Sequence, residues 1–153
     1  MFASIKVNVI NNDHSNNFEI VEQACSPQGN GSQWNNKGGK LTLSMGDNQG
    51  SGMLRFKTEQ NKEAFFIAMG VEAPRPWVDI VTGLGDDYTC VQALPDYYDY
   101  KSERSRMRGD RQVHQIENID RRLIRAEFKY SEGPNYELDI IINEKGSFVY
   151  SED

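Results

Sequence analysis

The stretch RPWVDIVTGLGDDY, residues 75–88, combines the pattern of a buried β-strand with one carboxylate inside it. Asp79 stands among apolar neighbours on both sides, which are Trp77, Val78, Ile80 and Val81. A charge in such surroundings needs a partner, a turn to cap or a ligand, because burying it alone is costly. The residues alone leave three readings of Asp79 open: the cap of a turn, a pair with a downstream arginine, or a binding group.

Alternating apolar residues on either side of this stretch predict further β-strands. The faces that they define are Ile5, Val7 and Val9; Leu41, Leu43 and Met45; Leu54 and Phe56; and Ile124, Ala126, Phe128 and Tyr130. The run EAFFIAMGV, residues 63–71, is continuously apolar, as in a central strand covered on both faces. Segments rich in Gly, Asn and Asp separate these runs, and YELDIII and GSFVY close the pattern. We therefore predict a mainly β fold, with short antiparallel strands in a sandwich or barrel.

The alternation stops between residues 86 and 110, where the composition favours short helices. Asp86 or Asp87 could cap a first helix, and Pro95 would end that helix or start the next. Gly109 could close the second. With 153 residues and no internal repeat, we expect one domain, residues 1–153, with this helical insertion in its middle.

Length and composition exclude several classes of protein. No apolar run reaches the roughly 18 residues of a membrane span, and the N-terminus lacks a secretory signal pattern, so we expect a cytoplasmic protein. Cys25 and Cys90 are too few for a disulfide framework or a zinc site, which favours free thiols in a reducing compartment. With only His14 and His114 as further ligands, we expect no metal and no cofactor.

The charge of the chain is uneven. The net charge is −6 and the pI is near 5.0, which argues against nucleic acid as a partner. Residues 101–125 nevertheless carry eight basic residues against four acids. This basic segment predicts the solvated face of a helix, with a nucleic-acid patch as the alternative.

Enzymatic and membrane-lytic functions are poorly supported. The chain has no nucleophile elbow, no P-loop and no dinucleotide fingerprint. Asp79 with Asp86 or Asp87 could imitate a glycosidase pair, but nothing in the sequence fixes their separation. A pore-forming cytolysin could use exposed aromatics such as Tyr97, Tyr98 and Tyr100, yet the N-terminus lacks a detachable amphipathic helix. We predict no catalytic residue.

Sugar binding suits the residues around Asp79. One carboxylate can accept hydrogen bonds from two adjacent hydroxyls, and such charge-assisted bonds are roughly twice as strong as neutral ones. Thr82 adds a hydroxyl and Ile80 an apolar surface at the same strand end.

At this point the sequence resembles a known family, the fungal fruit-body lectins. WVDIVTGL resembles their segment W-C-D-I-V-T-N-L, and SIKVNV resembles their first strand. Gly31 and Trp34 match a G-G-T-W turn, LTLSMG matches L-T-M-G, and SGMLRF matches S-G-(S/T)-L-R-F. Tyr97-Tyr98, Glu132-Gly133 and LDIII follow in order. The resemblance covers about residues 4–142 and leaves 143–153 as a C-terminal extension.

The resemblance implies a two-sheet, actinoporin-like β-sandwich with a helix-loop-helix connection. It also implies a cytoplasmic homotetramer, or a homodimer, whose partners are glycans and glycoproteins and which meets membranes only through glycan binding. Two sugar classes are implied, N-acetylglucosamine and the O-glycan disaccharide of galactose and N-acetylgalactosamine. A role in defence against feeding animals is implied as well.

The implied N-acetylglucosamine site keeps its centre in Asp79, Ile80 and Thr82. The family's arginine falls at Glu103, so Arg104 is expected to replace it, and the family's tyrosine is His114. The implied second site departs further. The family's alanine is Gly29, its Ser-Gly pair is Asn48 and Gln49, and its His-Asn pair is Glu72 and Ala73. Each lost hydrogen bond costs about 1 kcal/mol, so we expect a weak, altered or inactive second site.

Overall fold

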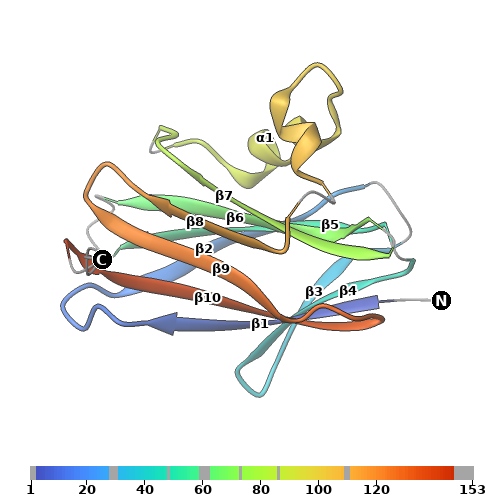
Figure 1. The fold of residues 1–153 in the computed structure, drawn as a ribbon, viewed down its shortest axis with the longest axis horizontal. Coiled ribbons are helices and arrows are strands. Elements are labelled where there is room, and N and C mark those ends of the chain that lie inside the picture. Colours follow the sequence, from blue (N-terminus) through green and yellow to red (C-terminus); the bar gives the residue numbers. More distant parts are fainter. Residues whose placement is uncertain are drawn as a thin grey trace, which may run out of the picture.

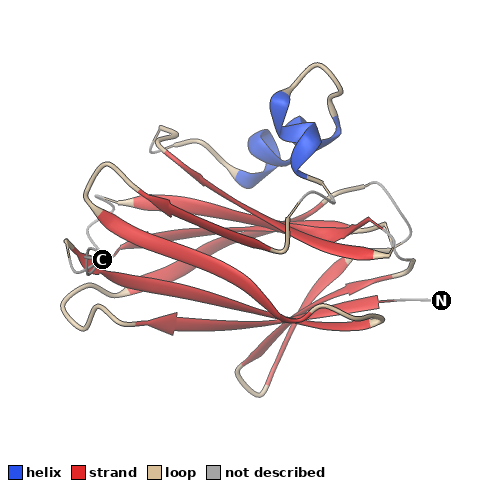
Figure 2. Cartoon of the chain, in the orientation of Figure 1, coloured by secondary structure: helices blue, strands red, loops and turns tan. Residues whose placement is uncertain are grey.

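The computed structural model describes residues 3–27, 31–47, 49–58, 63–72, 74–85, 87–108 and 111–146, and within them the chain forms a six-stranded and a four-stranded sheet. The two sheets face each other, and strands dominate the fold (Figures 1 and 2). In spatial order the larger sheet contains β3 (Gln33–Lys37), β4 (Lys40–Met45), β1 (Ala3–Asn11), β10 (Asn135–Lys145), β9 (Arg122–Tyr130) and β8 (Val113–Glu117). The smaller sheet contains β2 (Phe18–Cys25), β5 (Ser51–Thr58), β6 (Ala64–Glu72) and β7 (Arg75–Thr82). The predicted two-sheet β-sandwich is confirmed.

One strand pair departs from the expected antiparallel pattern. β1 and β10 lie side by side in parallel, with Ile5 opposite Tyr136 and Val9 opposite Ile140. The other pairings among the described strands are antiparallel. Alternation predicts that a segment is a strand but not the direction of its neighbour, so the sequence could not reveal this pair.

The space between the sheets holds the main core. Ile5 and Val7 are buried there, whereas Val9, which was expected on the same face, is exposed where β1 ends. The other predicted core residues that lie in it are Leu41, Leu43, Met45, Leu54, Phe56, Ile124, Ala126 and Phe128. Tyr130 is 58% exposed, contrary to expectation. A register shift between Glu137 and Leu138 of β10 lies opposite the end of β9 and takes Tyr130 out of the buried series.

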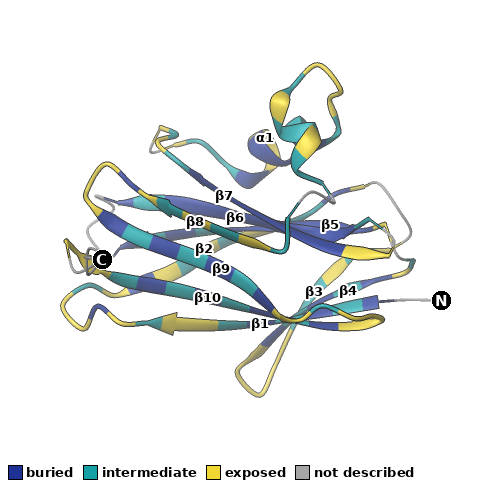
Figure 3. Ribbon diagram, in the orientation of Figure 1, coloured by how far each residue is buried: buried dark blue, intermediate teal, exposed yellow. Residues whose placement is uncertain are grey.

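Strand β6 of the smaller sheet is buried on both faces, as its apolar run predicted (Figure 3). Phe65, Ile67 and Met69 point into the main core. Phe66 and Ala68 belong to a second cluster on the opposite face, which includes Leu94 and other residues of the helical segment. This second cluster lies under residues 90–107, so the helical segment covers the smaller sheet from outside.

The segment predicted as helix-loop-helix contains one short α-helix and two 3₁₀ helices among its described residues. These are α1 (Cys90–Ala93), η1 (Leu94–Tyr98) and η2 (Glu103–Met107). Thr89 caps α1, and the side chain of Gln92 accepts a hydrogen bond from the Thr89 N–H in return. The expected cap at Asp87 is therefore wrong, while Asp86 lies outside the described residues. Pro95 lies in the first turn of η1, so it starts a helix as one reading predicted.

The remaining sequence predictions concern Gly109, the C-terminal residues, the two cysteines and a membrane span. Gly109 and most of the GSFVY segment lie outside the described residues, and β10 continues to Lys145, past the start of the expected extension at residue 143. Cys25 and Cys90 are free thiols, and Cys90 is buried. Within the described ranges, no helix is long and apolar enough to cross a membrane.

Candidate functional site

Strand β7 explains how a carboxylate comes to lie within an apolar run. Its even-numbered residues Val78 and Ile80 enter the main core, whereas Trp77 and Val81 join the cluster beneath the helical segment. Asp79 lies between Trp77 and Val81 on this outer face and is only 3% exposed. The helical segment therefore has to supply partners for its charge.

Three side chains surround the Asp79 carboxylate. The hydroxyl of Tyr97 in η1 donates to Oδ2 at 2.5 Å, and Arg104 Nη1 in η2 lies 3.4 Å from the same oxygen. Nδ1 of His114 in β8 lies 3.1 Å from Oδ1. Pairing with a downstream arginine, one of the three readings from sequence, is thus confirmed. Asp79 does not cap a turn, because it lies inside β7.

These partners decide the protonation of Asp79. Burial acts to raise the pKa of its carboxyl. Hydrogen bonds from His114 and Tyr97, with the charge of Arg104, outweigh burial, and the pKa falls below its ordinary value. Asp79 is therefore ionised at neutral pH and acts as a fixed acceptor.

His114 has two possible partners for one ring atom. Its Nδ1 lies 2.9 Å from the backbone N–H of Ile80 and 3.1 Å from Asp79 Oδ1. A neutral ring that accepts from Ile80 has a bare Nδ1, while a ring that donates to Asp79 carries a proton there. When Nδ1 carries no proton, the hydrogen bond from the Ile80 N–H holds the imidazole against β7. When Nδ1 carries a proton, its contact with Asp79 does so.

The predicted site residues line one open pocket of about 540 Å³. All five residues of the expected N-acetylglucosamine site contribute to it: Asp79, Ile80, Thr82, Arg104 and His114. Glu103 and Arg111 line it too, as do the apolar side chains of Met107 and Ile116. The pocket opens between β7, β8 and η2, and it combines a buried carboxylate with a cationic and an apolar wall.

Sequence reasoning did not assign Tyr97 or Arg111 to this region. Tyr97 was expected to be exposed, but it is fully buried and bonds to Asp79. Arg111 was counted only in the basic segment, although its side chain lines the pocket and donates to Met107 Sδ at 3.0 Å. Asp79 and Tyr97 are eighteen residues apart in the sequence, and no periodic signal pairs them.

The second predicted site is only partly visible, because Gly29, Asn48 and Ala73 lie outside the described residues. Gln49 and Glu72 flank the same end of the β5–β6 pair, where Val71 N–H donates to Gly50 O at 3.0 Å. Glu72 Oε1 lies 2.9 Å from Arg108 Nη1. The carboxylate that replaces the family's histidine is therefore already paired with an arginine.

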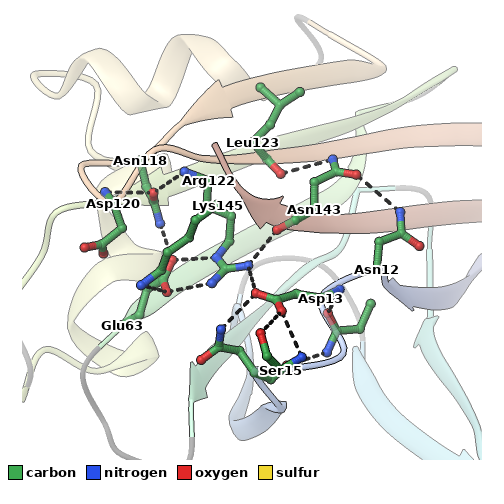
Figure 4. A network of polar contacts seen from close by, with 12 residues as sticks. Asn12, Asp13, Ser15, Glu63, Asn118, Asp120, Arg122, Leu123, Asn143 and Lys145 are labelled. Atoms are coloured by element: carbon green, nitrogen blue, oxygen red, sulfur yellow. Dashed lines mark hydrogen bonds and ion pairs between the residues drawn. The ribbon is translucent and has the colours of Figure 1, made fainter. Parts of the chain in front are cut away.

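The basic segment is not the face of one helix, so that interpretation is wrong. It runs through η2, β8, β9 and the loops that connect them, and Arg122 is completely buried. Figure 4 shows Arg122 between two carboxylates, Asp13 at 2.8 Å and Glu63 at 2.7 Å. Asn118 Nδ2 also donates to Glu63, at 2.6 Å. Despite burial, these bonds keep the pKa of Asp13 and Glu63 below their ordinary values.

The structure also bears on the alternative functions. Within the described part of the chain, no group of three His, Cys, Asp or Glu side chains could hold a metal ion. Asp87 is exposed and Asp86 is not described, so no second aspartate is seen beside Asp79. Of the tyrosines suggested for lipid contact, Tyr100 is 85% exposed, Tyr98 is half-buried and Tyr97 is inaccessible. An exposed row of three aromatics is therefore ruled out.

Comparison with known proteins identifies the class as carbohydrate-binding lectins. The chain belongs to the fungal fruit body lectin family, whose model matches residues 1–140. It is 34% identical to a lectin of Boletus edulis over 128 residues, which cover 82% of this chain and 87% of that one. The family resemblance found in the sequence is confirmed, and the protein is a non-enzymatic lectin.

Solved structures agree with this assignment. The Xerocomus chrysenteron lectin XCL has the same fold, with a TM-score of 0.87 and 29% identity, over 94% of this chain and all of that one. A variant of XCL gives a TM-score of 0.87 at 30% identity and covers 99% of its own chain.

Proposed function

We propose that the pocket at Asp79 binds a terminal N-acetylglucosamine residue of glycans and glycoproteins. The observation that carries this proposal is the meeting of Asp79, Thr82, Arg104 and His114 around one open pocket in a lectin fold. The closeness of these groups, which come from β7, η2 and β8, supports a binding role.

The chemistry of the pocket suits a sugar hydroxyl pair. Each carboxylate oxygen has two lone pairs, so Asp79 can accept from a ligand while Tyr97 and Arg104 hold it in place. Thr82 can donate or accept, and the apolar wall at Ile116 can cover a C–H face. Such a small contact supports an affinity on the order of mM to μM for a single site.

For the galactosyl-N-acetylgalactosamine disaccharide, we propose recognition that is weak, altered or lost. Glu72 is paired with Arg108, whose guanidinium also lies 4.5 Å from the centre of the Tyr98 ring. A sugar at Glu72 would have to compete with this arrangement. The absence of the family's amide side chain at Ala73 supports the same proposal.

The remaining expectations from the family are proposals too. We propose a single lectin domain that acts in the cytoplasm, assembles as a homotetramer or homodimer and serves in defence. Assembly would raise the apparent affinity for clustered glycans through avidity. Light scattering tests the assembly directly, and release of dye from glycan-free vesicles tests the rival pore-forming function, for which we expect no release.

Titration calorimetry with N-acetylglucosamine tests the main proposal. Asp79→Ala is expected to abolish binding, and the isosteric Asp79→Asn is expected to weaken it at least about tenfold, the loss of one charge-assisted bond. Asp87→Asn is the matched control, because Asp87 is exposed and does not line the pocket. Wild-type affinity in folded Asp79 variants, as judged by circular dichroism, would overturn the assignment.

A further inference from the structure

A smaller pocket adjoins the Asp79 pocket at the ends of β7 and β8. It has a volume of about 180 Å³, and Thr82 lines both pockets. Beyond Thr82 its walls are Gly83 and Leu84 on one side and Ile119 and Asp120 on the other. We propose that it is a second sugar subsite, which holds the next residue of an oligosaccharide whose first residue occupies the Asp79 pocket. This inference rests on the proposed function.

The two pockets are adjacent because of how β7 meets β8. Val78 N–H donates to Arg111 O at 3.1 Å, and Ile80 N–H lies 2.9 Å from His114 Nδ1. β7 and β8 therefore run side by side in the same direction, and Thr82 lies beside the last residues of β8. A chain that leaves the Asp79 pocket along these strands passes Thr82 and reaches Ile119.

The side chains of the smaller pocket suit one pyranose ring. Ile119 is 94% exposed and Leu84 is half-buried, so together they offer an apolar surface to the C–H face of a sugar. Asp120 is exposed and supplies a carboxylate for a hydroxyl, and Figure 4 shows this carboxylate turned away from the Arg122 guanidinium. An apolar platform beside one polar group is the usual composition of a small-ligand site.

The buried Arg122 network fixes the wall that carries Ile119. Asn118 Oδ1 accepts from the N–H groups of Asp120 at 3.0 Å and Arg122 at 2.9 Å. Glu63 in turn binds both Asn118 Nδ2 and the Arg122 guanidinium (Figure 4). The turn between β8 and β9 is thus anchored to a charge pair in the interior. A wall held in this way loses little entropy when a ligand binds, which favours affinity.

Calorimetric titration of the full chain with N-acetylglucosamine and with its β-linked dimer, diacetylchitobiose, tests the subsite. The wild-type protein should bind the dimer more than about threefold tighter than the monomer, beyond the twofold statistical gain. Ile119→Ser and Asp120→Ala should remove this gain and leave monomer affinity unchanged. Val21→Ser, an exposed apolar truncation on β2, is the matched control and should keep the gain.

The outcomes separate the subsite from the function on which it rests. If the wild-type protein binds the monomer but the dimer less than about threefold tighter, the subsite is overturned and the proposed function stands. A dimer preference that survives in both Ile119→Ser and Asp120→Ala also overturns the subsite. If the wild-type protein binds neither sugar, the proposed function itself fails.

Discussion

The hydroxyl of Tyr97 donates a 2.5 Å hydrogen bond to Asp79 Oδ2, and it links the helical segment to the strand beneath it. Both residues are buried, and they come from different elements that meet only in the folded chain. Asp79 therefore has a structural role, holding the helical segment to β7, as well as its proposed role in binding a sugar.

Tyr97→Phe tests the structural role of Asp79, because the substitution removes the hydroxyl that binds Asp79 and keeps the ring. We expect the free energy of unfolding to fall by about 1.5–3 kcal/mol at pH 7, the usual contribution of a hydrogen bond to a charged group. The Tyr97 bond lowers the pKa of Asp79, so its contribution is present above the unfolded pKa near 3.9. It is lost as pH falls through the folded pKa. Urea unfolding at pH 7 and pH 3 measures both effects.

Tyr98→Phe is the control for this experiment. Tyr98 shares a neutral hydrogen bond of 2.6 Å with Ser51, so its loss should cost about 1 kcal/mol at either pH. A cost for Tyr97→Phe at pH 7 that is no larger than the cost for Tyr98→Phe would contradict a bond to an ionised Asp79.

Arg122→Met should be among the most destabilising single substitutions in the protein. It leaves the buried carboxylates of Asp13 and Glu63 without their cation, which costs about 3–5 kcal/mol. Arg125→Met is the matched control, since Arg125 pairs with Glu127 at the surface and should cost less than about 1 kcal/mol. Thermal and urea unfolding of both variants measure the difference, and similar losses would show that the buried network contributes little.

The same network should make the protein sensitive to acid. Burial acts to raise the pKa of Asp13 and Glu63, but their bonds to Arg122 outweigh it and lower both values. The stabilisation is then complete above the unfolded values near 3.9 and 4.3, and it disappears progressively as pH falls below them. We expect the urea midpoint to drop between pH 6 and pH 3.

Asp13→Asn should be less stable than the wild type at pH 6 and should lose less on acidification. Glu117→Gln, at an exposed pair with Arg121, should keep the wild-type slope. An unchanged slope in Asp13→Asn would exclude this carboxylate as a source of the acid sensitivity.

His114→Tyr restores the residue that the family resemblance places at this position. A phenol reaches further than an imidazole and adds one hydrogen bond to a sugar, worth about 1 kcal/mol or about fivefold in affinity. We therefore expect tighter binding of N-acetylglucosamine in calorimetric titration. His14→Tyr, at the other and exposed histidine, should have no effect. Unchanged or weaker binding by His114→Tyr would remove His114 from the proposed contact surface.

Local pattern was enough to predict most of the fold. The alternation of Ile5 and Val7, and the continuous apolar run of β6, reflect burial that each segment carries in its own sequence. The parallel pairing of β1 with β10 and the exposure of Tyr130 depend on contacts between distant segments. They leave no periodic trace in either segment, so they could not be predicted.

The candidate site divides in the same way. Asp79, Ile80 and Thr82 are neighbours on one strand, and their chemistry could be recognised together. Tyr97 and Arg111 join them only through the folding of η1 and the approach of β8. Arg122 was wrongly predicted to be exposed, because a count of charges treats every arginine as solvated. The two carboxylates that pair with it, Asp13 and Glu63, lie far away in the sequence.

The parallel pairing of β1 with β10 also affects how the chain folds during synthesis. β1, which precedes the other described strands along the chain, lies between β4 and β10, while β9 and β8 reach it only through β10. Until this late strand emerges, the larger sheet exists as two unconnected parts with open edges. Such long-range pairing slows folding, and exposed edges invite aggregation. We therefore expect a nascent lectin chain to be most prone to aggregation in the interval before β10 leaves the ribosome.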